Sequence, residues 1–549
     1  MNLTQELKSI IKGDIFSEDP ILEQYSHDAS IFEIKPKVVV FPKDVSDLKT
    51  LVKFVSLNKK NEPNLSLTGR SAGTDMGGGS INDSIIVEFT KYFNKIISVD
   101  KNSAIAQPGV YYRDFEKETQ KHGVFFPSYP ASKDICAIGG IINNNSGGEK
   151  SLKYGKTQKY IKSLKAVLSD GSEYEFRKLD KNELEKKLKQ KDFEGEIYRK
   201  IFDLIHQNFG LLQAAKPKVS KNSAGYYLWD VYDDKNKTFD LTQLFAGSQG
   251  TLGLMTEVTL KLEPIHPHYE LVTIFLKDID HLGKIINAVL PLHPESFETY
   301  DDNTLKLAIK YFYSFANHLG GNLFSLFFKF LPEFKQLITG GIPKLVLLIE
   351  FNEPTHELID LKEEELSKKL RSLGIKMNII HKEKDAAKYW QIRRESFNLL
   401  RQKIHNKHTE PFIDDFIVPP QSLVEFLPKL EAILAKYPSL IYTIAGHVGD
   451  GNFHIIPLMN ISDPKERAII PVLQKEVQDL VLKYKGSITG EHNDGLIRTP
   501  YLKDMYGGKV VALFEETKKI FDPLGIFNPR KKVGGSLDYS MNHVRTRFE

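Results

Sequence analysis

The chain has 549 residues, with 75 Lys and Arg against 71 Asp and Glu, and a single cysteine. This length suggests roughly two to four domains of ~100 to 200 residues each. A net charge of +4 gives no argument for a nucleic-acid partner, and one cysteine excludes an intrachain disulfide framework, a Cys-ligated iron–sulfur cluster and a zinc ribbon. Electron chemistry in this chain would therefore need an organic cofactor or a metal held by histidine and carboxylate side chains.

The N-terminal region mixes acidic and basic side chains and lacks the apolar core of a secretory signal, so we expect a cytoplasmic protein. No stretch reaches the roughly 18 consecutive apolar residues that a membrane-spanning helix needs. The segment Tyr311–Phe334 is rich in aromatic residues but is interrupted by Gly320, Gly321 and Pro332. A pair of helices packed on a core is the preferred interpretation of this segment, and peripheral contact with a membrane surface is the alternative.

Short β-branched runs alternate with amphipathic segments in the first part of the chain. Asp44 and Asp47 are typical of a helix N-terminus that follows the apolar run PKVVVFP. Strands are predicted at 36–42, 65–69, 84–89, 95–100 and 103–109, and helices at 47–60 and 111–123. This order indicates an α+β fold with a hairpin-like succession of strands, and it does not require the parallel sheet of a nicotinamide-binding domain.

Three glycine-rich segments, Ser66–Ser80, Ile138–Gly155 and Gly247–Leu262, each adjoin an apolar run. Glycines let backbone N–H groups approach phosphate oxygens, and hydroxyl groups together with Arg70 supply further donors in the first segment. The first segment does not match the G-x-G-x-x-G fingerprint of nucleotide-binding Rossmann domains. One such segment would be an ordinary surface loop, but three favour a large phosphate-bearing cofactor bound by one domain.

A possible metal site lies in the second half of the chain. In Tyr442–Leu458 apolar runs flank the turn-former GDGN, which predicts a hairpin with His447 and His454 on either side of the turn. Glu491 would complete a His/His/Glu set with an open coordination position, and His492 is its neighbour. Because the histidine spacing matches no zinc motif, a pair of structural histidines stays open, as does a zinc hydrolase with merely structural glycine loops.

A candidate anion-binding arginine lies on a predicted helix. Arg393 falls inside an apolar stripe, whereas Arg394 falls outside it. A guanidinium on a buried face needs an anion, which is either a substrate carboxylate or an internal Asp or Glu. The other members of the stripe, at spacings of four and three, are Ala386, Trp390, Phe397, Leu400 and Ile404.

Several ordered motifs resemble a known family. The first glycine-rich loop, the GGIINNNSGG and YG elements and GSQGTLGLMTEV resemble the three flavin-contacting segments of FAD domains of the vanillyl-alcohol oxidase and para-cresol methylhydroxylase (PCMH) type. The motifs GHVGDGNFH, GEHNDG and FDPLGIFNP resemble the branch with D-lactate dehydrogenase, glycolate oxidase and D-2-hydroxyglutarate dehydrogenase. The resemblance covers about Tyr25 to Asn528, nearly the whole chain.

This resemblance implies an α+β fold in three parts. A PCMH-type FAD-binding domain of two subdomains would occupy 1–265, with an N-terminal helical segment at about 1–32. A substrate or cap domain with an antiparallel sheet and the metal site would occupy 266–505. The segment 506–549 would return to pack on the FAD domain.

The resemblance also implies roles for individual residues. The metal ligands would be His447, His454 and Glu491, which would hold zinc or manganese, and His492 would be the catalytic base. Arg393 would bind the substrate carboxylate, since the family's arginine follows a Trp by three residues, as here. The FAD contacts would be Gly69, Arg70, Ser71, Ala72, Gly73, Thr74, Gly139, Gly140, Asn145, Gly147, Gly148, Tyr154, Gly155, Gly250, Leu254 and Asn528.

The sequence departs from the family at a few positions. Gln249 stands where Glu is usual, which we expect the flavin site to tolerate, while Asn493 and Arg530 each replace a usual Gly. Asn adopts left-handed backbone less readily than Gly. Phe397 stands where the hydroxyglutarate enzymes have a second polar substrate contact, and their additional Lys has no match. These two differences favour a small or more apolar substrate.

The implied activity is oxidation of a D-2-hydroxy acid, with D-lactate to pyruvate as the first choice. D-2-Hydroxyglutarate or glycolate dehydrogenase, an alkylglycerone-phosphate synthase type without net oxidation, and a non-catalytic flavoprotein subunit are the alternatives. Electrons would pass to an external acceptor such as a quinone, a cytochrome, an electron-transfer flavoprotein or oxygen. Cys136, beside a flavin loop, is expected to be a small buried residue rather than a redox group.

Overall fold

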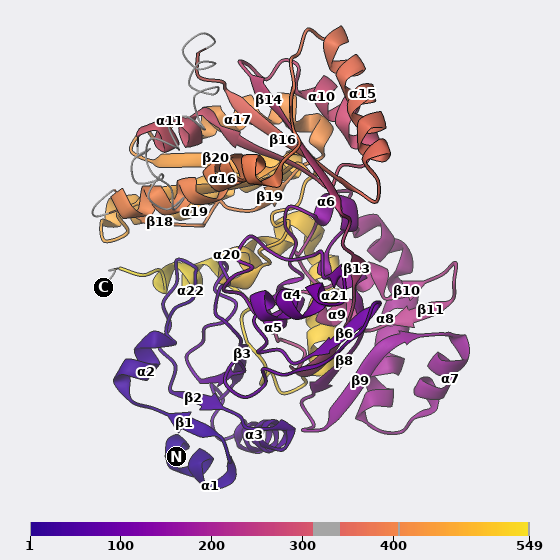
Figure 1. Ribbon diagram of the computed structural model, residues 1–549. Coiled ribbons are helices and arrows are strands. Elements are labelled where there is room, and N and C mark those ends of the chain that lie inside the picture. Colours follow the sequence, from indigo (N-terminus) through magenta and orange to yellow (C-terminus); the bar gives the residue numbers. More distant parts are fainter. Residues whose placement is uncertain (1, 311–340, 404–406, 547–549) are drawn as a thin grey trace.

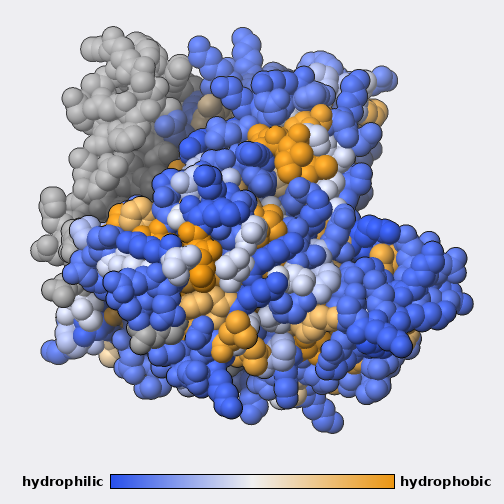
Figure 2. Space-filling model, turned by 90° about the horizontal axis from the view of Figure 1, so that it is seen from below, coloured by the Kyte–Doolittle hydropathy of each residue, from blue (hydrophilic) through white to orange (hydrophobic). Residues whose placement is uncertain are grey.

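The structure is a computed structural model that describes residues 2–310, 341–403 and 407–546 (Figure 1). The aromatic segment Tyr311–Phe334, for which packed helices and membrane contact were both considered, lies outside the described residues. Among the residues that are described, no helix is long and apolar enough to cross a membrane. The face shown in Figure 2 is mainly hydrophilic, with apolar side chains in separate groups.

The chain begins with a small sheet in the order β1-β2-β4-β3. Strands β2 and β3 both run parallel to β4, so the expected hairpin succession is wrong here. The predicted strands and helix are confirmed, and Asp44 begins the helix by accepting a hydrogen bond from the Asp47 N–H at 3.1 Å. The elements are α1 (Leu3–Ile10), β1 (Asp14–Phe16), α2 (Asp19–Gln24), β2 (Val38–Phe41), α3 (Val45–Asn58), β3 (Leu67–Arg70) and β4 (Ile85–Glu88).

A second, antiparallel sheet follows in the order β10-β11-β9-β8-β12-β6-β5. The predicted strands at 95–100 and 103–109 pair here as a hairpin, and the predicted helix at 111–123 forms α4 (Tyr112–Gln120). The strands are β5 (Ile96–Val99), β6 (Ser103–Ala106), β8 (Ile161–Val167), β9 (Glu173–Leu179), β10 (Tyr232–Asp233), β11 (Thr238–Asp240) and β12 (Leu254–Lys261). Around them lie α5 (Ile138–Asn144), α6 (Ser151–Tyr154), α7 (Lys181–Lys189), α8 (Phe193–Ala215) and α9 (Thr242–Phe245), with the small pair β7 (Val124–Phe125) and β13 (Glu263–Pro264).

The upper half of the molecule in Figure 1 is built on a larger antiparallel sheet in the order β17-β14-β16-β15-β20-β21-β18, with β19 paired to β21. The predicted hairpin at 442–458 is confirmed as β20 and β21. The strands are β14 (His268–Leu276), β15 (Ser296–Asp301), β16 (Leu345–Glu353), β17 (Asn378–Ile380), β18 (His408–Thr409), β19 (Phe416–Ile417), β20 (Ile441–His447) and β21 (Asn452–Met459).

Alternation along β16 explains how this sheet is covered on both faces. Leu347 and Ile349 join one core, to which α10 (Leu282–Val289), α15 (His356–Ser372), α17 (Leu423–Leu434) and α19 (Ile469–Lys483) contribute. Val346 and Leu348 face the opposite side, where they pack with residues of α16 (Glu383–Lys403). The helix that carries the candidate arginine therefore lies on the face opposite those four helices, where it packs beside α11 (Asp302–Lys310).

The C-terminal segment returns to the first half of the molecule, as the fold prediction required. The Leu67 N–H donates to the Ile526 carbonyl at 2.7 Å, and the Asn528 N–H donates to the Leu67 carbonyl at 2.8 Å. The helices after the larger sheet's last helix, α19, are α20 (Gly495–Arg498), α21 (Leu502–Phe521) and α22 (Leu537–Asn542) in the part of the chain that is described, and α21 packs on α8. The mixed helix and sheet architecture confirms the predicted α+β class.

Candidate active site

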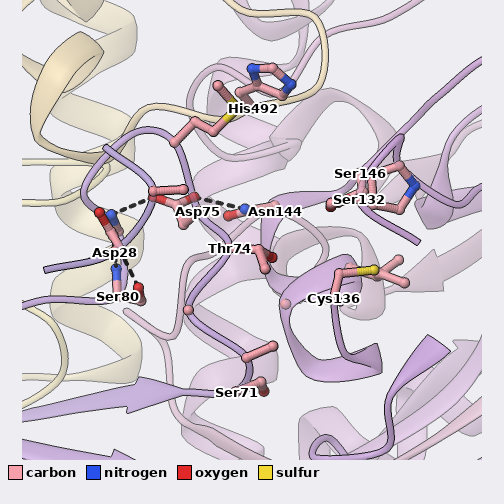
Figure 3. A pocket seen from close by; sticks show the side chains of 18 of the residues that line it. Asp28, Ser71, Thr74, Asp75, Ser80, Ser132, Cys136, Asn144, Ser146 and His492 are labelled. Carbon is pink, nitrogen blue, oxygen red and sulfur yellow. Dashed lines mark hydrogen bonds between the residues drawn. The ribbon is translucent and has the colours of Figure 1, made fainter. Parts of the chain in front are cut away.

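A cavity of about 1220 Å³ lies where the glycine-rich segments meet the larger sheet. This volume exceeds the ~300 to 1,000 Å³ of ordinary small-molecule sites, so it has room for a dinucleotide together with a small substrate. In Figure 3, Ser71, Thr74 and Asp75 of the first glycine-rich loop and Ser146 of the second are among the side chains around it, with His492 at its upper end. The candidate metal and catalytic side chains all line it: Arg393, His447, His454, Glu491 and His492.

The cavity wall fits a bound flavin dinucleotide. A Cβ built on Gly140 or Gly250 would meet no protein atom within 4 Å, so these backbones are open to the cavity rather than packed against protein. Gly139 differs, because its Cβ would come within 2.5 Å of the Ser71 Oγ. The expected cofactor residues that line the cavity are Gly69, Arg70, Ser71, Ala72, Gly73, Thr74, Gly139, Gly140, Gly147, Gly250 and Leu254.

Other expected cofactor residues support this wall from behind rather than lining it. The Asn528 Nδ2 donates to the carbonyls of Gly79 and Gln249, at 2.8 and 2.6 Å, which ties the C-terminal segment to two of the glycine-rich loops. The Tyr154 hydroxyl donates to Glu295 at 3.2 Å, across to the larger sheet. Asn145, Gly148 and Gly155 likewise do not belong to the lining.

The positions that depart from the family carry unusual backbone. Gln249, Asn493 and Arg530 all have positive φ, of 53°, 68° and 69°. The Asn493 side chain offsets the strain, since its Nδ2 donates to the Gly247 carbonyl at 2.9 Å. The Gln249 Oε1 accepts the Gly495 N–H at 2.9 Å. Both amides therefore connect glycine-rich loops to the segment that follows His492.

The candidate metal ligands converge on one point. The Nε2 atoms of His447 and His454 lie 3.1 and 3.4 Å from the Glu491 Oε1, and the three donor atoms are within 4.8 Å of one another. The opposite ring nitrogens face carboxylates: His447 Nδ1 lies 2.7 Å from Glu298, and His454 Nδ1 lies 2.9 Å from Asp414. Such partners orient the rings and leave Nε2 for a metal, so the donor set fits a divalent ion such as zinc or manganese.

Asp414 lies between two imidazoles. Its Oδ2 is 2.5 Å from the His492 Nδ1, and the rings of His492 and His454 stack with centroids 5.0 Å apart. Burial disfavours every charge here, but the neighbouring histidines outweigh it and hold the pKa of Asp414 well below its usual range. In return, and again against burial, Asp414 raises the pKa of His454 to about 10 and also raises that of His492. A bound divalent cation would oppose both protonations, because His454 must be neutral to ligate it and its positive charge would repel a proton on the neighbouring His492.

Arg393 lies buried on α16 beside this cluster. Its Nη2 forms an ion pair with the Glu298 Oε2 and lies 3.5 Å from the His447 Nδ1. Glu298 is thus the internal anion that one of the two sequence interpretations expected, although Arg393 also lines the cavity. Of the predicted apolar stripe, Ala386 and Trp390 are buried. The side chains of Phe397, Leu400 and Ile404 are not described.

Several buried charged residues of the site were missed by the sequence analysis. Asp415, at φ 66°, accepts hydrogen bonds from the N–H groups of Glu491 and His492 at 2.9 and 2.7 Å, and so shapes the loop that carries them. Lys221 lies 3.0 Å from the Glu491 Oε2. Two adjacent acidic residues inside the apolar run PFIDDFIV could have indicated Asp414 and Asp415, whereas no sequence feature near Lys221 indicated that it belongs to the site.

Cys136 is buried, and burial raises the pKa of its thiol to about 12, as expected of an inert residue.

Replacing Gly140 with valine is expected to weaken FAD binding about 10- to 100-fold while the fold stays intact. The new side chain would enter the cavity instead of displacing protein atoms, and overfilling a site costs ~1 to 3 kcal/mol. Flavin content at 450 nm and the thermal midpoint measure the two effects. Gly210→Val is the matched control, since Gly210 also lies in a helix and has no neighbour within 4 Å of its Cβ, but it does not line the cavity. Equal flavin content in both variants would place the cofactor elsewhere.

Comparison with known proteins places this architecture in a family. The sequence matches the FAD binding domain over residues 36–177 and the C-terminal domain of FAD linked oxidases over residues 265–532. The D-2-hydroxyglutarate dehydrogenase of Pseudomonas putida is 27% identical over 95% of this chain and 50% of its own length. The glycolate oxidase subunit GlcD of Bacillus subtilis is 27% identical, with 92% of this chain and 91% of that protein covered. A D-lactate dehydrogenase of Anaerostipes hadrus is 25% identical, with 96% of each chain covered.

This chain spans about half the length of several hydroxyglutarate dehydrogenases that it matches. Among solved structures, p-cresol methylhydroxylase with substrate bound has a TM-score of 0.67 at 16% identity, with 97% of this chain and 96% of that chain covered. An alkyldihydroxyacetonephosphate synthase has a TM-score of 0.65 at 16% identity, with 96% and 84% covered. These two likenesses concern the fold. With both domain matches in order along the sequence, the chain belongs to the FAD-linked oxidases, and it shares the fold of p-cresol methylhydroxylase.

Proposed function

We propose that this chain oxidises a D-2-hydroxy acid to the 2-oxo acid, with FAD in the cavity and a divalent ion held by His447, His454 and Glu491. The observation that carries the proposal is the convergence of these three ligands, with His492, on the cavity that the glycine-rich loops line. When bound, FAD would supply the hydride acceptor, and the ion would make the substrate hydroxyl more acidic. A zinc hydrolase is disfavoured, since glycine-rich segments of a FAD-binding domain line the same cavity as the candidate ligands.

The chain's own residues would then bind the substrate and move one proton. Arg393 would hold the substrate carboxylate, with Glu298 fixing the guanidinium in place. The Nε2 of His492 would take the hydroxyl proton, because its Nδ1 already faces the Asp414 carboxylate at 2.5 Å. Arg393, Glu298 and Asp414 are buried, which would limit access of water to the proton that is being transferred.

D-Lactate is the first choice of substrate, because Phe397 and the missing lysine argue against a second carboxylate contact. D-2-Hydroxyglutarate is the second candidate, since two further basic residues, His408 and Arg545, line the cavity and could meet a second carboxylate. Glycolate is the smallest alternative.

The domain boundaries that we propose remain 1–265, 266–505 and 506–549. The electron acceptor would lie outside this chain, whose single cysteine excludes an internal iron–sulfur relay.

An anaerobic visible spectrum tests the proposal directly. The flavin-loaded protein is mixed with D-lactate, L-lactate, D-2-hydroxyglutarate or glycolate, with and without a chelator. Bleaching at 450 nm by a D-isomer, prevented by the chelator, is the expected result. A flavin that no hydroxy acid reduces would favour the non-oxidising synthase type or a non-catalytic subunit, and a protein that binds no FAD would contradict the proposal altogether.

Replacing Arg393 with alanine is expected to raise the apparent KM for the hydroxy acid about 10- to 100-fold, since a hydrogen bond to a charged group is worth ~1.5 to 3 kcal/mol. Steady-state kinetics and a thermal melt separate the two possible roles. If Arg393 serves only as the partner of the buried Glu298, the melting temperature falls and KM stays unchanged. Arg393→Lys is the control that keeps the charge, and we expect it to recover only part of the affinity because the planar fork is lost.

A further inference from the structure

We infer that Lys221 is a positioning residue that holds the Oε2 of Glu491, so that its Oε1 stays turned toward His447 and His454, where the metal would bind. The inference rests on the proposed metal-dependent function and assigns a role to a buried lysine from a segment distant from the metal hairpin in sequence. The Lys221 Nζ lies 3.0 Å from the Glu491 Oε2, whereas the Oε1 of the same carboxylate faces the Nε2 atoms of His447 and His454. The two oxygens of Glu491 therefore have separate partners.

The surroundings of Lys221 show that its ammonium group is held in place. Its side chain is 1% exposed, and its Nζ also lies 3.3 Å from the Asp450 Oδ2 and 3.2 Å from the Gly148 carbonyl. Asp450 belongs to the turn between the strands that carry His447 and His454, and Gly148 belongs to the second glycine-rich segment. Lys221 thus connects the metal hairpin, the Glu491 loop and the cofactor wall at one point.

The charge balance gives the physical reason for this arrangement. Without a metal, Glu491 lies beside two histidines, and its carboxylate could rotate to accept hydrogen bonds from either oxygen. The Lys221 ammonium group on Oε2 holds the Oε1 of Glu491 toward the two imidazole rings. The carboxylate therefore loses less conformational freedom when an ion binds. Removing the ammonium would also leave two buried carboxylates, Glu491 and Asp450, without their shared cation. We therefore expect weaker metal binding rather than a direct loss of chemistry.

The test is metal affinity of the FAD-loaded protein, measured with chelator-buffered Zn²⁺ and separately with Mn²⁺. Lys221→Met is expected to weaken binding about 10- to 100-fold, the usual loss when a residue that orients a metal ligand is removed. Lys221→Arg, which keeps the charge, should restore part of the affinity. In a Glu491→Gln background, the Lys221→Met change should cause little further loss, because the residue acts through that carboxylate.

Lys156→Met is the matched control. Lys156 is a nearby buried lysine whose Nζ donates to the carbonyls of Asn222 and Gly490 at 2.7 and 2.6 Å, and no hydrogen bond joins it to Glu491 within the described residues. Equal loss of metal affinity in the Lys156 and Lys221 variants would overturn the specific role. If Lys221→Met loses its flavin or melts early, the milder Lys221→Gln carries the same comparison.

The outcomes separate this inference from the proposed function. If the wild-type protein binds neither ion, the metal site itself fails before any variant is compared. If the wild type binds the ion and both folded Lys221 variants bind it equally well, only the role of Lys221 is contradicted. Additive losses from Lys221→Met and Glu491→Gln would also contradict it, since the lysine would then act through another group.

Discussion

Replacing His492 with alanine is expected to slow flavin reduction by the hydroxy acid about 100- to 10,000-fold, which is the usual contribution of a positioned general base. The reason lies in the geometry around the ring. Its Nδ1 is 2.5 Å from the Asp414 carboxylate, so Nε2 is the nitrogen available to a substrate hydroxyl in the cavity. FAD should remain bound, because the cofactor wall is built from the glycine-rich loops.

The measurement is stopped-flow absorbance at 450 nm under anaerobic conditions, with saturating substrate. His27→Ala is a suitable control, since His27 also lines the cavity but takes no part in the proposed proton transfer. We expect the control to reduce its flavin at close to the wild-type rate. An unchanged rate in His492→Ala would reject the base assignment, and loss of flavin would show instead that the ring supports the cofactor site.

The sequence predicted those parts of the site that are encoded locally. His447 and His454 flank one turn, and a hairpin with a short turn must bring the residues on either side of it together. Glu491 and His492 are adjacent in the chain, so one loop places both. The same holds for the fold, because the Asp44 cap and the alternation of apolar residues are local signals that each fix one element.

What the sequence could not predict depends on contacts between distant segments. Glu298 lies in β15, where every side chain is buried, and nothing in the run SFETYD indicates that this glutamate meets both Arg393 and His447. Lys221 reaches Glu491 across 270 positions of the chain. The parallel pairing of β2, β3 and β4 was missed for the same reason, since strand order is decided by packing rather than by any single strand.

The charged residues of the site that the sequence analysis missed share one physical property. Each is a buried charge whose partner comes from another element, and a buried charge is tolerated only when it is paired. A chain that keeps several such groups around one cavity must compensate each with a specific neighbour. Glu298, Asp414, Asp415 and Lys221 are buried, and each contacts one of the candidate metal ligands.

Removal of the divalent ion is expected to stop flavin reduction by the hydroxy acid, with a rate at least about 1,000-fold lower, while FAD stays bound. Charge stabilisation by a metal is worth several kcal/mol, and each ~1.4 kcal/mol corresponds to a factor of ten. The candidate ligands lie on the hairpin and on the Glu491 loop, whereas most of the expected cofactor residues that line the cavity lie on the glycine-rich loops, so the flavin has its own contacts.

The experiment compares protein dialysed against a chelator with the same protein after Zn²⁺ or Mn²⁺ is returned, with metal content measured directly. Photoreduction of the flavin is the control, because it needs neither substrate nor metal and should be equal in all samples. Recovery with one ion and not the other would identify the preferred metal. Full activity in metal-free protein would show that His447, His454 and Glu491 are a hydrogen-bonded structural cluster, which is the alternative that their sequence spacing left open. The stacked rings of His454 and His492, which both face Asp414 through Nδ1, would then have to supply the polarisation that we assign to the ion.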